Sequence, residues 1–315
     1  MLHLRITSPA DLTEEVLALF ADDPAVSQLA VMRGASLEPV GDIVLADVAR
    51  EAANELLDRL DALGVPECGT IHVDPVTTWV SRAGYDAERH TPGAGADAVV
   101  WADVTQRAYD ESELNWTYVS FMTLATMLAS IAVLVDSQVL VIGAMVLGPE
   151  FLPIAALGLA LVRRRGGLFR LAARTLTVGF VVAIAVTTVA ALAVRALGWA
   201  VVGDVTGPRP GTDFIYSPDK WSFIVAVIAA AAGVLSLTSA KVGGLSGVFI
   251  SVTTVPAAGN VALGIAFGAG DEVWGSTIQL ALNISGMIVA GWATLALQHL
   301  IWNRKGRHRQ LVLRG

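Results

Sequence analysis

The sequence predicts a mostly α-helical membrane protein with a small α+β domain at its N-terminus. Apolar stretches long enough to cross a bilayer fill residues 117–302, and proline interrupts two of them. The charge also changes sign near Trp116: residues 1–116 hold 21 acidic and 7 basic side chains, whereas the remainder holds 7 acidic and 14 basic ones. We therefore expect a water-soluble acidic domain followed by a basic, apolar membrane domain.

Residues 1–80 alternate short strand and helix patterns. Alternating apolar and polar residues mark the first strand, and apolar residues at helical spacing from Ala49 to Leu63 mark the longer helix. Strands are expected at residues 2–6, 27–32, 42–47 and 70–74, with helices at 11–20 and 49–63. We expect the second strand to end at Arg33 and Gly34. The order βαββαβ predicts a ferredoxin-like domain.

This N-terminal domain is expected to lie in the cytoplasm, because its first residues are followed by polar and acidic ones rather than by an apolar signal core. Its acidic surface repels phosphate and lacks a basic stripe, which argues against nucleic acid as a partner. A regulatory or oligomerising module and a passive cap on the membrane domain both fit. Residues 81–116 are expected to form a linker and then an amphipathic helix at the membrane interface.

Residues 117–302 divide into six apolar spans, each close to the roughly 20 residues that cross a bilayer core of about 30 Å. The expected spans are residues 117–135, 138–161, 171–197, 221–240, 245–268 and 276–302. Arginines gather in the loop after the second span and in the basic tail, residues 303–315. The positive-inside rule places both regions in the cytoplasm, so both termini are expected there.

The membrane domain has two halves of similar length, residues 117–197 and 221–302. Residues 156–160, Ala-Leu-Gly-Leu-Ala, and residues 262–266, Ala-Leu-Gly-Ile-Ala, follow the two proline interruptions and suggest an internal duplication. Each half contains an odd number of spans, so the second half must enter the membrane from the opposite side. We therefore expect two inverted three-helix repeats, each with a broken second helix.

The two interruptions predict a site near the bilayer midplane. Proline removes a backbone donor and frees a carbonyl one turn earlier. Such a break is tolerated where it is buried in protein or lines a wet cavity, and matched breaks indicate a site for an ion or small polar solute. The expected site residues are Pro149, Glu150, Pro153, Thr253, Thr254, Pro256, Gly259 and Asn260, with Asp136, Gln279 and Asn283 as accessory residues.

Several of these residues allow two interpretations. Glu150 is the only acidic residue at this depth, and an intramembrane carboxylate is too costly to face lipid. It is expected to bind a cation, to carry a proton, or to be neutral and cap broken-helix amides. The threonine hydroxyls either bind a solute or bond to their own helix. Gln279 and Asn283 join either the site or a subunit contact.

These motifs resemble the membrane proteins that carry the domain of unknown function numbered 389, a prokaryotic group. The resemblance rests on Asp136-Ser137, residues 141–146 (Val-Ile-Gly-Ala-Met-Val), residues 149–153 (Pro-Glu-Phe-Leu-Pro) and residues 246–260, and covers the chain from about Trp116 to Trp302. It implies a multi-pass protein of a prokaryotic plasma (inner) membrane. It supplies no reaction or substrate.

We expect a transporter or channel for an ion or small polar solute, in contact with membrane lipid and assembled as a homo-oligomer. The alternative is a membrane-anchored sensor or scaffold. Transport predicts a solvent-accessible cavity reaching Glu150 and Pro256, whereas a packed centre would favour the scaffold. The sequence shows no paired reactive groups, and it has a lone cysteine, Cys68, and scattered histidines. No enzyme activity, catalytic residue, cofactor or metal is therefore expected.

Overall fold

The computed structural model describes residues 1–93, 95, 98–216, 220–239 and 253–313, with side chains described as far as residue 301. The chain forms two compact units. The first contains Met1–Val104 and two short later segments. The second contains Thr105–Leu237 and later residues as far as Leu297.

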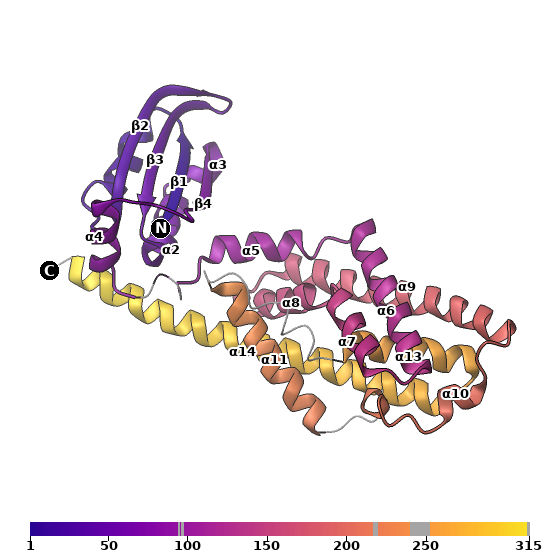
Figure 1. Ribbon diagram of the computed structural model, residues 1–315. Coiled ribbons are helices and arrows are strands. Elements are labelled where there is room, and N and C mark those ends of the chain that lie inside the picture. Colours follow the sequence, from indigo (N-terminus) through magenta and orange to yellow (C-terminus); the bar gives the residue numbers. More distant parts are fainter. Residues whose placement is uncertain (94, 96–97, 217–219, 240–252, 314–315) are drawn as a thin grey trace. The chain divides into compact units, whose positions relative to one another are not determined.

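A four-stranded antiparallel sheet forms the framework of the first unit (Figure 1). Its strands are β1 (Leu2–Ser8), β2 (Val26–Leu37), β3 (Val40–Val48) and β4 (Thr70–Pro75), in the order β2-β3-β1-β4. Its helices are α1 (Thr13–Phe20), the 3-10 turn η1 (Arg50–Ala52), α2 (Ala53–Ala62), α3 (Val65–Cys68) and α4 (Arg82–His90). Apolar residues of β1 and β3 pack against α1 and α2, so Leu4, Phe20 and Leu56 are fully buried.

The strand β2 runs past the turn that Arg33 and Gly34 were expected to form. Gly34 has a φ of 61° and lies where the register between β2 and β3 shifts between Met32 and Ser36. A left-handed glycine at such a shift makes a β-bulge, which bends a strand without ending it. The hairpin therefore turns later, between Leu37 and Val40.

The linker expected after residue 80 contains a helix. The side chain of Ser81 accepts a hydrogen bond of 3.2 Å from the backbone N–H of Gly84, and this N-cap begins α4. Arg89 and His90 occupy the last turn, where basic side chains suit the helix dipole. Glycine in a polar stretch indicated a loop, but Gly84 is needed because a Cβ there would lie 2.8 Å from the Trp79 ring.

The second unit is helical. Its helices are α5 (Trp101–Asp110, which begins in the first unit), α6 (Trp116–Leu134), α7 (Gln138–Leu147), α8 (Phe151–Arg163), α9 (Gly166–Ala196), α10 (Val202–Thr206), the 3-10 turn η3 (Asp213–Ile215), α11 (Lys220–Thr238), α13 (Thr254–Phe267) and α14 (Gly270–Leu313). Helix α13 packs against α6 and α9, and α6 packs against α7 and α9.

Four described helices are long and apolar enough to cross a membrane: α6, α9, α11 and α14. A fifth span is obtained if α7 and α8, which are bent by 54° at their break, are counted together. The expected fifth span, 245–268, is described only from residue 253, where α13 has 14 residues; residues 245–252 lie outside the described part. The expected tail, residues 303–315, continues α14 as far as Leu313.

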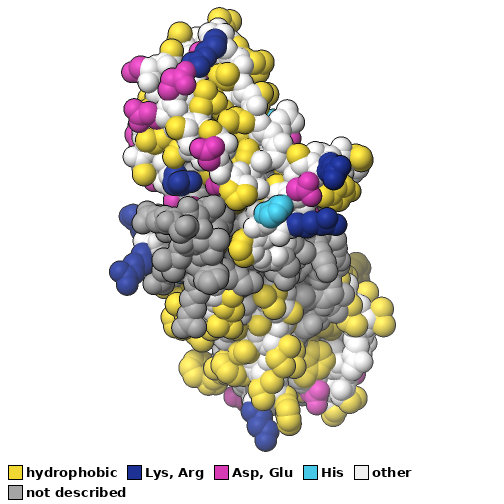
Figure 2. Space-filling view, turned by 90° about the vertical axis from the view of Figure 1, so that its left-hand side faces the viewer, with side chains coloured by type: hydrophobic (Ala, Val, Ile, Leu, Met, Phe, Trp, Pro, Cys, Tyr) yellow, Lys and Arg dark blue, Asp and Glu magenta, His cyan; other side chains and the backbone are white. Residues whose placement is uncertain are grey.

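The surface of the helical unit is apolar where a bilayer would surround it. Large side chains of α6 and α9, among them Leu124, Val181 and Val189, are more than half exposed. Figure 2 shows hydrophobic side chains over much of this unit, whereas acidic side chains are spread over the first unit. Exposed apolar helices of this length are compatible with a membrane protein.

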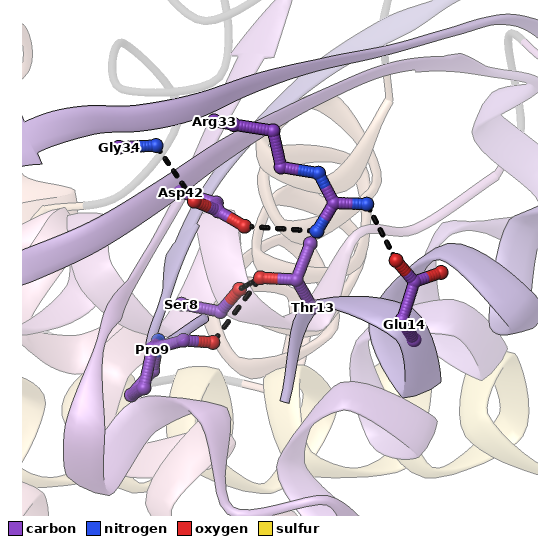
Figure 3. A network of polar contacts seen from close by, with 7 residues as sticks. All are labelled: Ser8, Pro9, Thr13, Glu14, Arg33, Gly34 and Asp42. Carbon is purple, nitrogen blue, oxygen red and sulfur yellow. Dashed lines mark hydrogen bonds and ion pairs between the residues drawn. The ribbon is translucent and has the colours of Figure 1, made fainter. Parts of the chain in front are cut away.

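A polar network supports the bulge in the first unit (Figure 3). One carboxylate oxygen of Asp42 accepts a 2.7 Å hydrogen bond from the backbone N–H of Gly34, and the other accepts one of 3.1 Å from Arg33 Nη1. Arg33 also pairs with Glu14 of α1 at 2.5 Å. The Gly34 hydrogen bond, followed by other hydrogen bonds and the Arg33 charge, lowers the pKa of Asp42.

This network predicts a pH-dependent stability. Because the pKa of Asp42 is lower in the folded state, its contribution is complete above the unfolded value of about 3.9 and is lost as pH falls through the folded value. Asp42→Asn should therefore speed hydrogen exchange in β2 and β3 at pH 7, and the difference from the parent should shrink below about pH 4. Peptide-resolved exchange, corrected for intrinsic rates, measures this.

The exposed Asp22, for which no interaction is described, gives the control Asp22→Asn. It should leave exchange in β2 and β3 unchanged at every pH. A difference between Asp42→Asn and the parent that stays constant down to pH 3 would contradict the assignment.

Candidate functional site

The two proline interruptions lie at the beginnings of short helices. Helix α7 ends at Leu147 and α8 begins at Phe151, so that Gly148, Pro149 and Glu150 form the break. Pro153 is the third residue of α8 and Pro256 the third residue of α13. Proline is tolerated in a first helical turn because the N–H groups there have no partner within the helix. Counted from the helix starts, Pro153 corresponds to Pro256.

The structure brings the two broken segments into contact. Thr254 Oγ1 donates a 2.5 Å hydrogen bond to Glu150 Oε1, and both side chains are buried. A Cβ on Gly148 would lie 2.7 Å from Val255 Cγ2, closer than real Cβ atoms approach. Glycine at position 148 therefore allows the chain before α8 to lie against the first turn of α13.

Four polar residues lie on one face of α14, at successive steps of four, three and four. They are Glu272, Ser276, Gln279 and Asn283, and all four are buried. This spacing puts them on one helical stripe. Glu150, Arg209, Thr254 and Asn260 are buried as well, and Thr253 is half-buried. These nine residues form two groups, linked by hydrogen bonds and by the adjacency of Thr253 and Thr254 in the chain, which together we call the polar seam.

Asn260 occupies one end of the polar seam and has no exposed surface. Its Oδ1 accepts a hydrogen bond of 3.2 Å from Arg209 Nη1, and its Nδ2 donates to Glu272 Oε2 and Ser276 Oγ, both at 2.8 Å. Arg209 Nη2 lies 2.9 Å from Glu272 Oε1, an ion pair without hydrogen-bond alignment. This end of the polar seam therefore contains a buried charge pair joined through an amide.

The other end is formed around Thr253 and Thr254. Thr253 Oγ1 accepts hydrogen bonds from Asn283 Nδ2 at 2.9 Å and from Gln279 Nε2 at 3.3 Å. The oxygens Glu150 Oε2, Gln279 Oε1 and Asn283 Oδ1 are buried without a hydrogen-bond partner among the described residues. These three unpaired atoms are acceptors, and the buried Tyr118 hydroxyl, which interacts electrostatically with Glu150, also has no hydrogen-bond partner among the described residues.

Other expected site residues have different positions. Gly259 packs on α6, where a Cβ would lie 2.9 Å from Ala129 Cβ and 3.0 Å from the Ser130 nitrogen. Asp136 lies in the turn after α6 and accepts hydrogen bonds from Gly211 N at 3.1 Å and from Thr212 Oγ1 at 2.9 Å. Both residues hold elements together. Neither has a described hydrogen bond to Glu150.

The described state buries the expected site. Glu150 is 7% exposed, and Pro256 is buried as well. Among the described residues, neither side chain is therefore open to solvent at the protein surface. Of the described side chains, Glu150 is hydrogen-bonded to Thr254.

Sequence reasoning missed Arg209, Glu272 and Ser276. The sequence contained two signals for them. Arg209 is the one basic residue between Leu197 and Lys220, and prolines flank it on both sides. Ser276 and Glu272 extend the helical stripe of Gln279 and Asn283 by one and two turns.

The fold and the polar seam define a helical protein with membrane-length apolar helices and a buried polar interior. Residues 145–289 match the model of the family described as "Domain of unknown function (DUF389)". This match is to the family that the resemblance named, over a shorter range, and the matched residues include the whole polar seam. Neither the curated proteins nor the solved structures gave a match.

The packing of α13 on α6 predicts that Gly259→Ala destabilises the second unit. A methyl group must push apart Gly259 and the α6 backbone at Thr126 and Ser130, and such overpacking costs about 1–3 kcal/mol. Thermal unfolding of the purified protein should show a lower Tm. Gly203→Ala is the matched control, because a Cβ at Gly203 meets nothing within 4 Å; an equal effect of both variants would contradict the assignment.

The buried pair predicts non-additive effects. Removing either charge leaves the other buried and unpaired, which costs about 3–5 kcal/mol. Arg209→Met and Glu272→Met should each lower the free energy of unfolding by that order. The double variant should lower it by clearly less than their sum, with a coupling of more than about 1 kcal/mol. Additive effects in urea unfolding would show that the two residues do not interact.

Proposed function

We propose that the protein transports an ion or a small polar solute through the polar seam. The observation that carries the proposal is the 2.5 Å hydrogen bond from Thr254 Oγ1 to Glu150 Oε1, which joins the break before α8 to the first turn of α13. Buried polar side chains within apolar helices are costly unless they are paired or used in function. Three acceptor oxygens at this end have no hydrogen-bond partner among the described residues. A purely structural role for these side chains would not require unpaired oxygens.

The proposed architecture is that of two inverted three-helix repeats. Two features support it, in registers that differ by three residues. Pro153 and Pro256 are each the third residue of a short helix that packs against α9, but Gly158 lies five residues after Pro153 and Gly264 eight residues after Pro256. The glycines of the two similar pentapeptides, Gly158 and Gly264, also share a structural role. A Cβ on Gly158 would lie 2.9 Å from the Trp292 nitrogen, and one on Gly264 would lie 3.1 Å from the Val273 nitrogen. Because neither glycine has a side chain, the backbone of α14 can pack closely against both positions.

We propose a ferredoxin-like fold and a regulatory or oligomerising role for the first unit. The element order of two βαβ halves and the sheet order β2-β3-β1-β4 support the fold. A cytoplasmic location for this unit and for the basic end of the chain is part of the proposal, and the arginines after α8 support it. The proposed prokaryotic inner membrane is what the family resemblance implies. Assembly as a homo-oligomer is part of this proposal.

A sensor or scaffold is the second candidate function. The burial of Glu150 and Pro256 favours it, because a closed polar seam also fastens helices together. In that case the seam is structural. The membrane unit would then anchor the first unit without moving a solute.

Flux measurements distinguish the two functions. Proteoliposomes should pass at least one of Na⁺, K⁺, H⁺, glycerol or urea faster than protein-free vesicles. Glu150→Gln should lower that flux about tenfold or more, equivalent to about 1.4 kcal/mol in the barrier. Asn260→Ala should lower it too, because Arg209 and Glu272 lose the amide between them.

The control is Asp271→Asn, which neutralises an exposed carboxylate one residue from Glu272. Its flux should equal that of the parent. Flux no faster than that of empty vesicles for all five probes would refute transport and favour the scaffold.

A further inference from the structure

We infer that the end of the polar seam around Glu150 is a binding site for a monovalent alkali cation. This inference rests on the proposed transport function and names its substrate class. Its basis is the chemistry of the atoms gathered around Thr253 and Thr254, which is more specific than the presence of a polar interior.

The candidate ligands are all oxygen atoms. Glu150 Oε2, Gln279 Oε1 and Asn283 Oδ1 are buried and unpaired among the described residues. Glu150 is bonded to Thr254, and the two amides are bonded to Thr253, the preceding residue of the chain. Hard oxygen ligands are those that alkali and alkaline-earth cations prefer.

The Glu150 carboxyl group has no counter-ion among the residues that the structure describes. Glu150 forms no ion pair with any described side chain, and the nearby members of the polar seam are neutral hydroxyls and amides. Arg209, the basic member of the polar seam, is paired with Glu272 at the other end, at 2.9 Å. A buried carboxylate needs a proton or a cation as its partner.

The ligand set favours a monovalent cation over a divalent one. It contains one carboxylate, so that a single positive charge neutralises it. Calcium sites use several oxygen ligands with more than one carboxylate, and magnesium keeps most of its waters. Among the described residues, no group of three or more His, Cys, Asp or Glu side chains is placed to hold a metal ion.

Thermal unfolding of the full-length protein in detergent tests the site without relying on transport. NaCl or KCl replaces choline chloride at constant ionic strength and pH. A cation that binds the folded state raises the Tm, by about 2–5 °C once its concentration is far above the dissociation constant. The parent protein should show this saturable rise with Na⁺ or K⁺.

Two variants locate the cation. Glu150→Gln should abolish the rise, because it removes the charge while keeping the shape. Gln279→Met removes one amide oxygen at similar volume and should raise the half-saturating concentration several-fold. Asp271→Asn and Thr277→Val change an exposed carboxylate and an exposed hydroxyl of α14, and both should keep the parent response.

The outcomes separate the inference from the proposed function. The same Tm in choline, Na⁺ and K⁺, or an unchanged rise in Glu150→Gln, would overturn the cation site. If glycerol or urea flux were still present, transport would stand with a different substrate. A saturable rise lost in Glu150→Gln supports the cation site, even if flux were absent.

Discussion

The polar seam is the interaction on which the rest of the helical unit depends. A buried polar group without a partner costs a few kcal/mol, so helices that carry such groups must meet in one register. Asn260 fixes that register, because its amide bonds to Arg209, Glu272 and Ser276 at once. Once α13 and α14 are set in this way, Thr253 comes into reach of Gln279 and Asn283.

Small residues let the remaining helices follow. Gly259 brings α13 onto α6, where Ser130 Oγ donates a 3.0 Å hydrogen bond to its carbonyl oxygen. Arg195 of α9 bonds to the Ala266 carbonyl at 2.7 Å, so that a basic group closes the C-terminal end of α13. Helix α13 is thus held at its beginning, middle and end by polar contacts.

The sequence could predict the features that depend on local sequence patterns. Proline and glycine marked the break between α7 and α8, and Pro256 marked the first turn of α13. The expectation that these two segments meet agrees with the hydrogen bond between Thr254 and Glu150. The sequence could not predict that Gly34 would act as a bulge or that Ser81 would cap a helix, because both depend on neighbours brought close by folding. The burial of Arg209 could not be predicted either, because it also depends on neighbours brought close by folding. An arginine in a loop is ordinarily exposed.

The two ends of the polar seam differ in charge balance, and that difference gives the seam a direction. At the Asn260 end, Arg209 neutralises Glu272, and its guanidinium also lies over the Tyr216 ring at 4.8 Å. That cation belongs to the chain and cannot leave. At the Glu150 end the carboxyl group is bonded to a neutral hydroxyl, and no described basic side chain pairs with it. The two ends therefore differ in how a charge is balanced: one contains its own ion pair, whereas at the other a proton, or the bound cation inferred above, would have to balance the carboxylate.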